Sequence, residues 1–143
     1  MGRVGDGLRA ENAGWTFGNE GAGSFDEHIS RSVPLYAEGH KLVCALSDFF
    51  VKSGSMAYDI GCSTGTLTAA LARHNLPKKG ARFVGVDIEL GMIEKAMCKK
   101  AAAGLDNVDF IADDVLLMDL EPADMIVCYY TRSSSSGRAA GRN

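Results

Sequence analysis

Cysteine pairs are absent from this chain of 143 residues. The four cysteines, Cys44, Cys62, Cys98 and Cys128, stand far apart, and no two of them form a C-x-x-C motif. This spacing excludes the usual pattern of a zinc site, and a chain of this size does not need a disulfide framework. We therefore predict reduced thiols, which are typical of a cytoplasmic protein, and no metal site.

Long apolar runs and a large excess of one charge are also missing. No stretch approaches the roughly 20 apolar residues of a membrane span, and residues 1–6 lack the apolar segment of a signal peptide. The net charge of −3 disfavours a protein that grips a nucleic-acid backbone. We expect a cytoplasmic protein that acts on a small molecule, with no membrane partner and no direct nucleic-acid partner.

Short apolar runs alternate with helical patterns along most of the chain, which indicates βαβ units. We predict an α/β fold: a Rossmann-like parallel sheet of about four strands with helices on both faces. The expected strands are residues 55–60, 82–87, 108–112 and 123–129, and the expected helices between them are residues 66–74 and 90–103. In the second of these helices we expect Met92, Ile93 and Ala96 inside and Lys99 outside, with Gly104 ending the helix.

The two ends of the chain have a different composition. Residues 1–24 hold seven glycines and little periodicity, which predicts a flexible leader, and residues 132–143 predict a disordered low-complexity tail. The domain is expected over residues 25–131. It should start with a short helix at residues 25–31 and a longer one from Pro34 to about Val51, with His40 near its surface. The inner face of this longer helix is expected to carry Leu35, Leu42, Leu46 and Phe49.

The segment 58–65, Tyr-Asp-Ile-Gly-Cys-Ser-Thr-Gly, predicts a strand that runs into a glycine turn and then a helix. Asp87 ends the next strand, 22 residues after Gly65. In an open α/β sheet, ligands bind outside the carboxyl ends of the strands, and glycines let the backbone approach them closely. A carboxylate at Asp87 could accept hydrogen bonds from ribose hydroxyls. These features predict a site for a nucleotide-type cofactor.

Over residues 55–131 these motifs resemble the class I S-adenosylmethionine (SAM) dependent methyltransferases. The resemblance implies that Asp59 and the turn bind the methionine part of SAM and that Asp87 binds its ribose. It also implies that Ile88 or Met92 packs on the adenine and that Asp114 or Asp113 accepts a hydrogen bond from the adenine amino group. The full cofactor-binding set implied in this way is Asp59, Gly61, Cys62, Ser63, Gly65, Asp87, Ile88, Met92, Asp113, Asp114, Val115 and Tyr129.

Residues 15–17, 25–29, 31–36 and 129–131 resemble one branch of these proteins, the carboxy-SAM synthases. That branch converts SAM and prephenate into carboxy-SAM, which is used to modify wobble uridine in tRNA. The resemblance therefore implies SAM, S-adenosylhomocysteine or carboxy-SAM as ligand and prephenate as substrate. No catalytic residue is assigned.

The resemblance stops after the fourth of the family's seven strands. We hypothesise a truncation, most simply a frameshift just after Thr131. The alternative to a transferase is then a truncated, non-catalytic SAM-binding module. An exposed fourth strand would favour self-association, so a homodimer is a further expectation.

Two other functions compete for the glycine turn. Residues 61–65 also match G-x-S-x-G of α/β-hydrolases, but His74, the one histidine after Ser63, precedes every later acidic candidate. An NAD-dependent oxidoreductase would suit Asp87 as well. However, its pyrophosphate would meet the negative charge of Asp59, whereas the cationic sulfonium and ammonium groups of SAM suit that carboxylate.

Overall fold

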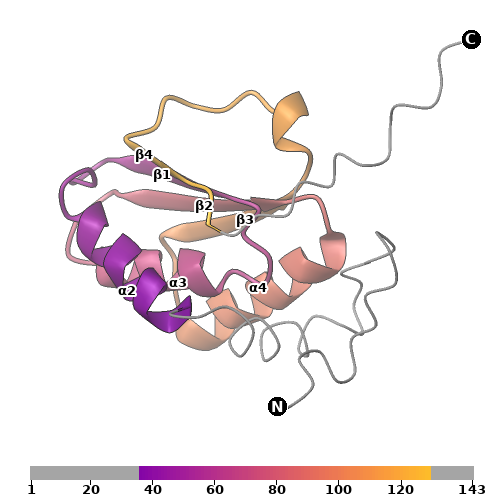
Figure 1. Ribbon diagram of the computed structural model, residues 1–143, viewed down its shortest axis with the longest axis horizontal. Helices are drawn as coiled ribbons and strands as arrows, with labels where there is room; N and C mark the ends of the chain where they lie inside the picture. The colour runs from indigo at the N-terminus through magenta and orange to yellow at the C-terminus, as the bar shows by residue number, and fades with distance from the viewer. Residues whose placement is uncertain (1–35, 130–143) are drawn as a thin grey trace, which may run out of the picture.

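The computed structural model describes residues 36–129, which form a parallel sheet with helices packed below it (Figure 1). The predicted leader, the short helix at residues 25–31 and the tail at residues 132–143 lie outside the described residues. The elements are α2 (Tyr36–Ser47), β1 (Met56–Ile60), α3 (Thr66–His74), β2 (Arg82–Asp87), α4 (Leu90–Ala103), β3 (Val108–Ala112), the 3-10 turn η2 (Val115–Leu117) and β4 (Met125–Val127).

The strands lie in the order β3-β2-β1-β4, and every neighbouring pair is parallel. β1 is central: its Ala57 stands opposite Phe83 of β2 on one side and Met125 of β4 on the other. The predicted α/β fold and its four strands are confirmed. The fourth strand is shorter than the predicted 123–129, because its ladder with β1 spans three residue pairs only.

The α-helices of the described residues lie on one face of the sheet, and not on both faces as predicted (Figure 1). The chain passes from β1 to β2 to β3 in one direction across the sheet, and right-handed crossovers then place α3 and α4 on the same side. The main core lies between these helices and the sheet, around Phe83, Leu71 and Val108. The opposite face is covered by the segment between β3 and β4, which packs on Tyr58 and its neighbours.

The helix α2 differs from its prediction in length and in the face that it buries. It ends at Ser47 rather than near Val51, and its buried side chains are His40, Cys44 and Ser47. Leu42, Leu46 and Phe49, which were predicted to point inward, are 60%, 43% and 76% exposed. Leu35 lies outside the described residues.

Close approach of the neighbouring elements explains which face of α2 is buried. A Cβ atom at Gly39 would overlap the hydroxyl of Tyr129, which follows β4, so this side of the helix must be free of bulk. The small side chains of Cys44 and Ser47 continue the same stripe toward α3. His40, predicted near the surface, is buried because it belongs to this stripe.

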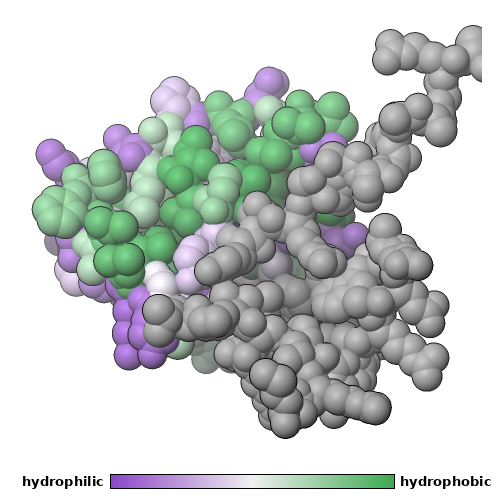
Figure 2. Space-filling model, in the orientation of Figure 1, coloured by the Kyte–Doolittle hydropathy of each residue, from purple (hydrophilic) through white to green (hydrophobic). Residues whose placement is uncertain are grey.

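The apolar side chains that α2 turns away from the core remain exposed. Figure 2, in the orientation of Figure 1, shows hydrophobic residues gathered over the side on which α2 and β4 lie. Among the described residues, β4 pairs with β1 alone, so its outer edge has no neighbouring strand. On that side the exposed large apolar residues are Leu42, Leu46, Phe49 and Phe50, in α2 and the turn after it, and Ile126 in β4. Leu116 and Leu117 are exposed separately in η2.

We predict that the double variant Leu46→Ser/Phe49→Ser self-associates less than the wild-type chain, because association would bury this apolar area at about 25 cal/mol per Å². Sedimentation velocity over a concentration series measures the effect. The matched control is Lys41→Ser/Lys52→Ser, which changes two exposed polar side chains of the same region and should leave self-association as it is. A wild-type chain that sediments as a monomer at every concentration would contradict the prediction.

Candidate functional site

A pocket lies at the carboxyl end of β1, where the order in which the chain adds strands to the sheet reverses. The loop after β1 leads to α3 and β2 on one side, whereas β4 pairs with β1 on the other side. Such a switch point between strands leaves a crevice that binds ligands in open α/β sheets. The residues that line the pocket are Tyr36, His40, Asp59, Gly61, Cys62, Ser63, Thr64, Thr66, Leu67 and Tyr129.

The turn after β1 is built from residues in the left-handed region of backbone space. Gly61, Ser63 and Gly65 have φ values of 70°, 52° and 78°. At Gly65 a side chain is also excluded by space, because a Cβ atom would lie 2.7 Å from the Phe110 ring and 2.8 Å from Ala96 Cβ. Ser63 adopts this conformation with a side chain, which is uncommon and requires support from its surroundings.

Asp87 supplies that support. Its Oδ2 accepts a hydrogen bond from the Ser63 backbone N–H at 2.8 Å, and its Oδ1 accepts one from the Glu89 N–H at 2.9 Å. The carboxylate therefore ties the turn after β1 to the turn after β2. Each carboxylate oxygen has two lone pairs, so both can still accept a hydroxyl group of a ligand.

Asp59 is 4% exposed at the end of β1 and lines the pocket. Its Oδ2 accepts a hydrogen bond from the Thr68 hydroxyl at 2.7 Å. Its pKa is raised to about 7, chiefly by burial; the Thr68 hydrogen bond acts against this rise, and the charge of Asp87 adds a smaller increase. None of the ion pairs among residues 36–129 involves Asp59. The pocket therefore contains a buried carboxyl group that a ligand cation would stabilise in its charged form.

Cys62 lines the same pocket but is no nucleophile. Its burial, together with the negative charges of Asp59 and Asp87, raises the pKa of the thiol far above its ordinary value. Within residues 36–129, no group of three or more histidine, cysteine or carboxylate side chains is placed to hold a metal ion.

Lys99 of α4 braces the glycine turn from behind. Its Nζ donates to the hydroxyls of Thr64 at 2.8 Å and Thr66 at 2.7 Å. We predicted this side chain to point outward, but it is partly buried. The contact joins residues 33 and 35 positions apart, so no local sequence pattern announces it.

Three aromatic rings form the wall of the pocket opposite the glycine turn. The ring centroids of Tyr36 and His40 are 4.2 Å apart, and those of His40 and Tyr129 are 5.1 Å apart with the planes at 62°. The Tyr129 hydroxyl donates to the Tyr36 carbonyl at 3.4 Å. Burial lowers the pKa of His40, which favours the neutral ring. Our sequence reasoning missed His40, although its spacing of four residues from Tyr36 places both on one side of a helix.

The predicted cofactor residues fall into two groups. Five of them line the pocket: Asp59, Gly61, Cys62, Ser63 and Tyr129. The others lie outside this lining, in the turn before α3, along the carboxyl ends of β2 and β3 or in α4: Gly65, Asp87, Ile88, Met92, Asp113, Asp114 and Val115. Hydrogen bonds of Asp87 join the two groups. Its side chain accepts from the Ser63 N–H, and its backbone carbonyl accepts from the Asp113 N–H at 3.0 Å.

Members of the second group differ in how far they are exposed to a ligand. Ile88 is 45% exposed directly after β2, whereas Met92 is 1% exposed in α4. Asp113 is exposed, and Asp114 caps η2 by accepting the Leu116 N–H at 3.0 Å. Val115 packs against the small core on the upper face of the sheet.

The pKa of Asp59 makes the stability of the ligand-free protein depend on pH. Folding raises this pKa from 3.8 to about 7, so between these values the folded protein keeps a proton that the unfolded chain loses. The protonated Asp59 side chain therefore makes its full contribution to the free energy of unfolding below about pH 4, and this contribution is lost as the pH rises through 7. We predict that the wild-type chain loses stability relative to Asp59→Asn between pH 5 and pH 8, as measured by urea denaturation. An unchanged difference between the two proteins would contradict the assignment.

The sequence matches a family described as a methyltransferase domain over residues 51–137. It is 40% identical over 102 residues to carboxy-S-adenosyl-L-methionine synthase of Staphylococcus epidermidis, an alignment that covers 71% of this chain and 42% of that protein. The corresponding protein of Wolinella succinogenes is 37% identical over 114 residues, which are 77% of this chain and 45% of that one. The chain therefore spans less than half the length of these relatives.

Comparison with a solved structure identifies the same fold. The solved structure is that of a protein of Methanococcus maripaludis described as an S-adenosyl-L-methionine-dependent methyltransferase, with a TM-score of 0.63 and 28% identity over 88% of this chain and 54% of that chain. None of the three α-helices in residues 36–129 has the length and apolarity that a bilayer crossing requires. The chain belongs to the methyltransferase domain family and has the Rossmann-like fold of the class I SAM-dependent enzymes, with sequence similarity to the carboxy-SAM synthases.

Proposed function

We propose that this chain binds SAM along the carboxyl edge of its sheet, with the methionine part in the pocket and the adenosine across β2 and β3. The observation that carries the proposal is the order of the two carboxylates. Asp59 is buried in a pocket that aromatic rings also line and lacks an ion pair within the described residues, whereas Asp87 has its carboxylate fixed by two backbone N–H groups. A ligand with a cationic group followed by the two hydroxyls of a ribose matches this order, with the cation at Asp59 and the hydroxyls at Asp87.

The charge of the pocket favours SAM over a dinucleotide. A sulfonium or ammonium group near Asp59 would gain from an opposite charge in a site of low dielectric, and the aromatic rings of Tyr36 and Tyr129 would add cation–π attraction. A pyrophosphate at the same place would face two carboxylates, Asp59 and Asp87. The same argument disfavours the NAD-dependent alternative.

The adenine end of the cofactor is assigned by exposure. Ile88 has an accessible apolar side chain beside Asp87, whereas Met92 is enclosed in α4, so we assign the adenine contact to Ile88. Asp113 and Asp114 follow β3, next to Asp87 along the sheet edge. Either carboxylate has lone pairs left for an exocyclic amino group.

We further propose that the whole protein is a transferase of the carboxy-SAM synthase type, as its relatives are named. In that reaction the methyl carbon of SAM would lose a proton and form a bond to carbon dioxide. Prephenate would release the carbon dioxide together with a hydroxide, which takes the proton as water, and the product would serve wobble-uridine modification of tRNA. The residues described here would bind and orient the cofactor and exclude water from one side. We assign no residue of the pocket as a catalytic base, and a SAM-binding module without catalysis is the second candidate.

These two candidates are separated by a product assay. The chain is incubated with SAM and prephenate, and carboxy-SAM is measured by mass spectrometry. Formation of carboxy-SAM by the chain supports the transferase. SAM binding without carboxy-SAM formation supports the binding module.

We predict micromolar binding of S-adenosylhomocysteine, and much weaker binding of NAD, by calorimetric titration. Asp87→Ala should weaken S-adenosylhomocysteine binding by about 1–3 kcal/mol, because charge-assisted hydrogen bonds to the ribose and to the turn are lost. The matched control is Asp106→Ala, which removes an exposed carboxylate in the loop before β3, at the other end of the strands. Equal losses in the two variants, or equal affinity for NAD, would refute the proposed site.

A further inference from the structure

Two of the three aromatic rings of the pocket, Tyr36 and His40, come from α2, which contributes Cys44 and the partly buried Val43 to the main core. Its large apolar side chains Leu42 and Leu46 are exposed, and its buried stripe is small and partly polar. The hydrophobic effect therefore contributes little to fixing the helix, since it acts in proportion to the apolar area buried. Specific polar contacts must determine where α2 stands.

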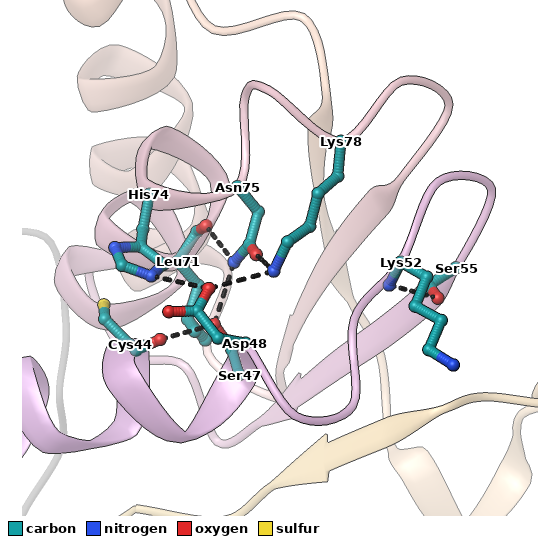
Figure 3. Close-up of polar contacts among 9 residues, drawn as sticks. All are labelled: Cys44, Ser47, Asp48, Lys52, Ser55, Leu71, His74, Asn75 and Lys78. Atoms are coloured by element: carbon teal, nitrogen blue, oxygen red, sulfur yellow. Dashed lines mark hydrogen bonds and ion pairs between the residues drawn. The ribbon is translucent and has the colours of Figure 1, made fainter.

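A network of hydrogen bonds joins the last turn of α2 to the last turn of α3 (Figure 3). Asn75, directly after α3, is fully buried, and its Nδ2 donates to Ser47 Oγ at 3.0 Å and to the Leu71 carbonyl at 2.9 Å. Its Oδ1 accepts from Lys78 Nζ at 2.7 Å. Ser47 in turn donates to the Cys44 carbonyl at 2.6 Å. Every hydrogen-bonding atom of the Asn75 side chain is thus used.

A second, outer layer of this network involves Asp48. Its Oδ1 accepts from Lys78 Nζ at 3.0 Å and lies 3.1 Å from His74 Nε2, with 55% of the Asp48 side chain exposed. The hydrogen bond from Lys78 lowers the pKa of Asp48. Exposed ion pairs of this kind contribute little to stability. The buried Asn75–Ser47 contact is therefore the principal connection between the two helices at this end.

The two helices run side by side from the pocket to this network. Tyr36 and Thr66, the first residues of α2 and α3, line the pocket, whereas Ser47 and Asn75 meet at the far ends. A 12-residue helix is about 18 Å long and stiff, so a shift at Ser47 moves Tyr36 and His40 as well. At the near end, Tyr129 contacts the helix through a long hydrogen bond to the Tyr36 carbonyl, at 3.4 Å, and through its ring, 5.1 Å from that of His40.

We propose that Asn75 is a positioning residue for the cofactor pocket: through Ser47 it sets the place of α2, and with it the place of the Tyr36 and His40 rings. Asn75 does not line the pocket itself. The inference rests on the proposed function, because it takes the aromatic wall to be part of the SAM site.

The test compares Asn75→Ala with Asn107→Ala in the full chain. Asn107 is a matched control, because its Nδ2 also donates to a carbonyl of α3, that of Ala72 at 2.8 Å, but it has no hydrogen bond to α2. Both variants should lose stability, so binding of S-adenosylhomocysteine is measured at a temperature where each is fully folded. We expect at least a fivefold loss of affinity for Asn75→Ala and no change for Asn107→Ala. If Asn75→Ala does not fold, Ser47→Ala removes the same contact from the other side.

A double-mutant cycle separates positioning from a general loss of rigidity. If Asn75 acts through the rings of Tyr36 and His40, then Asn75→Ala should cost little further affinity in a Tyr36→Ala/His40→Ala background. Independent losses that multiply would overturn the proposal, as would unchanged affinity of Asn75→Ala.

A ligand-free measurement distinguishes failure of this inference from failure of the proposed function. A wild-type chain that does not bind S-adenosylhomocysteine would refute the SAM site. The NMR shifts of the His40 ring protons still test the positioning in that case, because they report the neighbouring rings of Tyr36 and Tyr129. They should move in Asn75→Ala and stay in Asn107→Ala, and equal shifts in both variants would refute the positioning role.

Discussion

The carboxylate of Asp87 joins the two turns on which the pocket is built. Its bonds to the Ser63 and Glu89 backbone connect the ends of adjacent strands, β1 and β2, and hold Ser63 at a φ of 52°. A charged acceptor is stronger than a neutral one, so this contact can offset the cost of a left-handed residue that has a side chain. The shape of the turn and the proposed ribose contact therefore depend on one side chain, which couples the folding of the site to its ligand chemistry.

Two carboxylates at neighbouring strand ends acquire different properties from their surroundings. Asp87 receives two backbone N–H groups, which fix the orientation of its side chain. Asp59 receives one hydroxyl and is buried, which raises its pKa to about 7. The protein can therefore keep Asp59 protonated when the pocket is empty and charge it when a cation enters. Proton release on binding would be the physical link between pH and ligand affinity.

The parts of the structure that the sequence predicted are those with a local signature. Strand ends, the glycine turn and the end of α4 at Gly104 depend on residues close together in the chain. The inner face of α2 does not, because its periodicity offers two stripes and only the contacts of Gly39 with Tyr129 and of Ser47 with Asn75 select one. Two further features were not predicted because they also depend on parts of the chain far apart in sequence. The hydrogen bond of Lys99 to Thr64 is a long-range contact, and the placement of the helices on one face follows from the strand order.

The central claim is that one ligand spans the carboxyl edge from the aromatic pocket to the end of β3. A crystal structure of this chain with S-adenosylhomocysteine tests it most directly. We predict the amino-acid end of the ligand between Asp59 and Tyr36, the ribose hydroxyls on Asp87 and the adenine over Ile88. A ligand bound at another surface, or one whose ribose makes no contact with Asp87, would contradict the account.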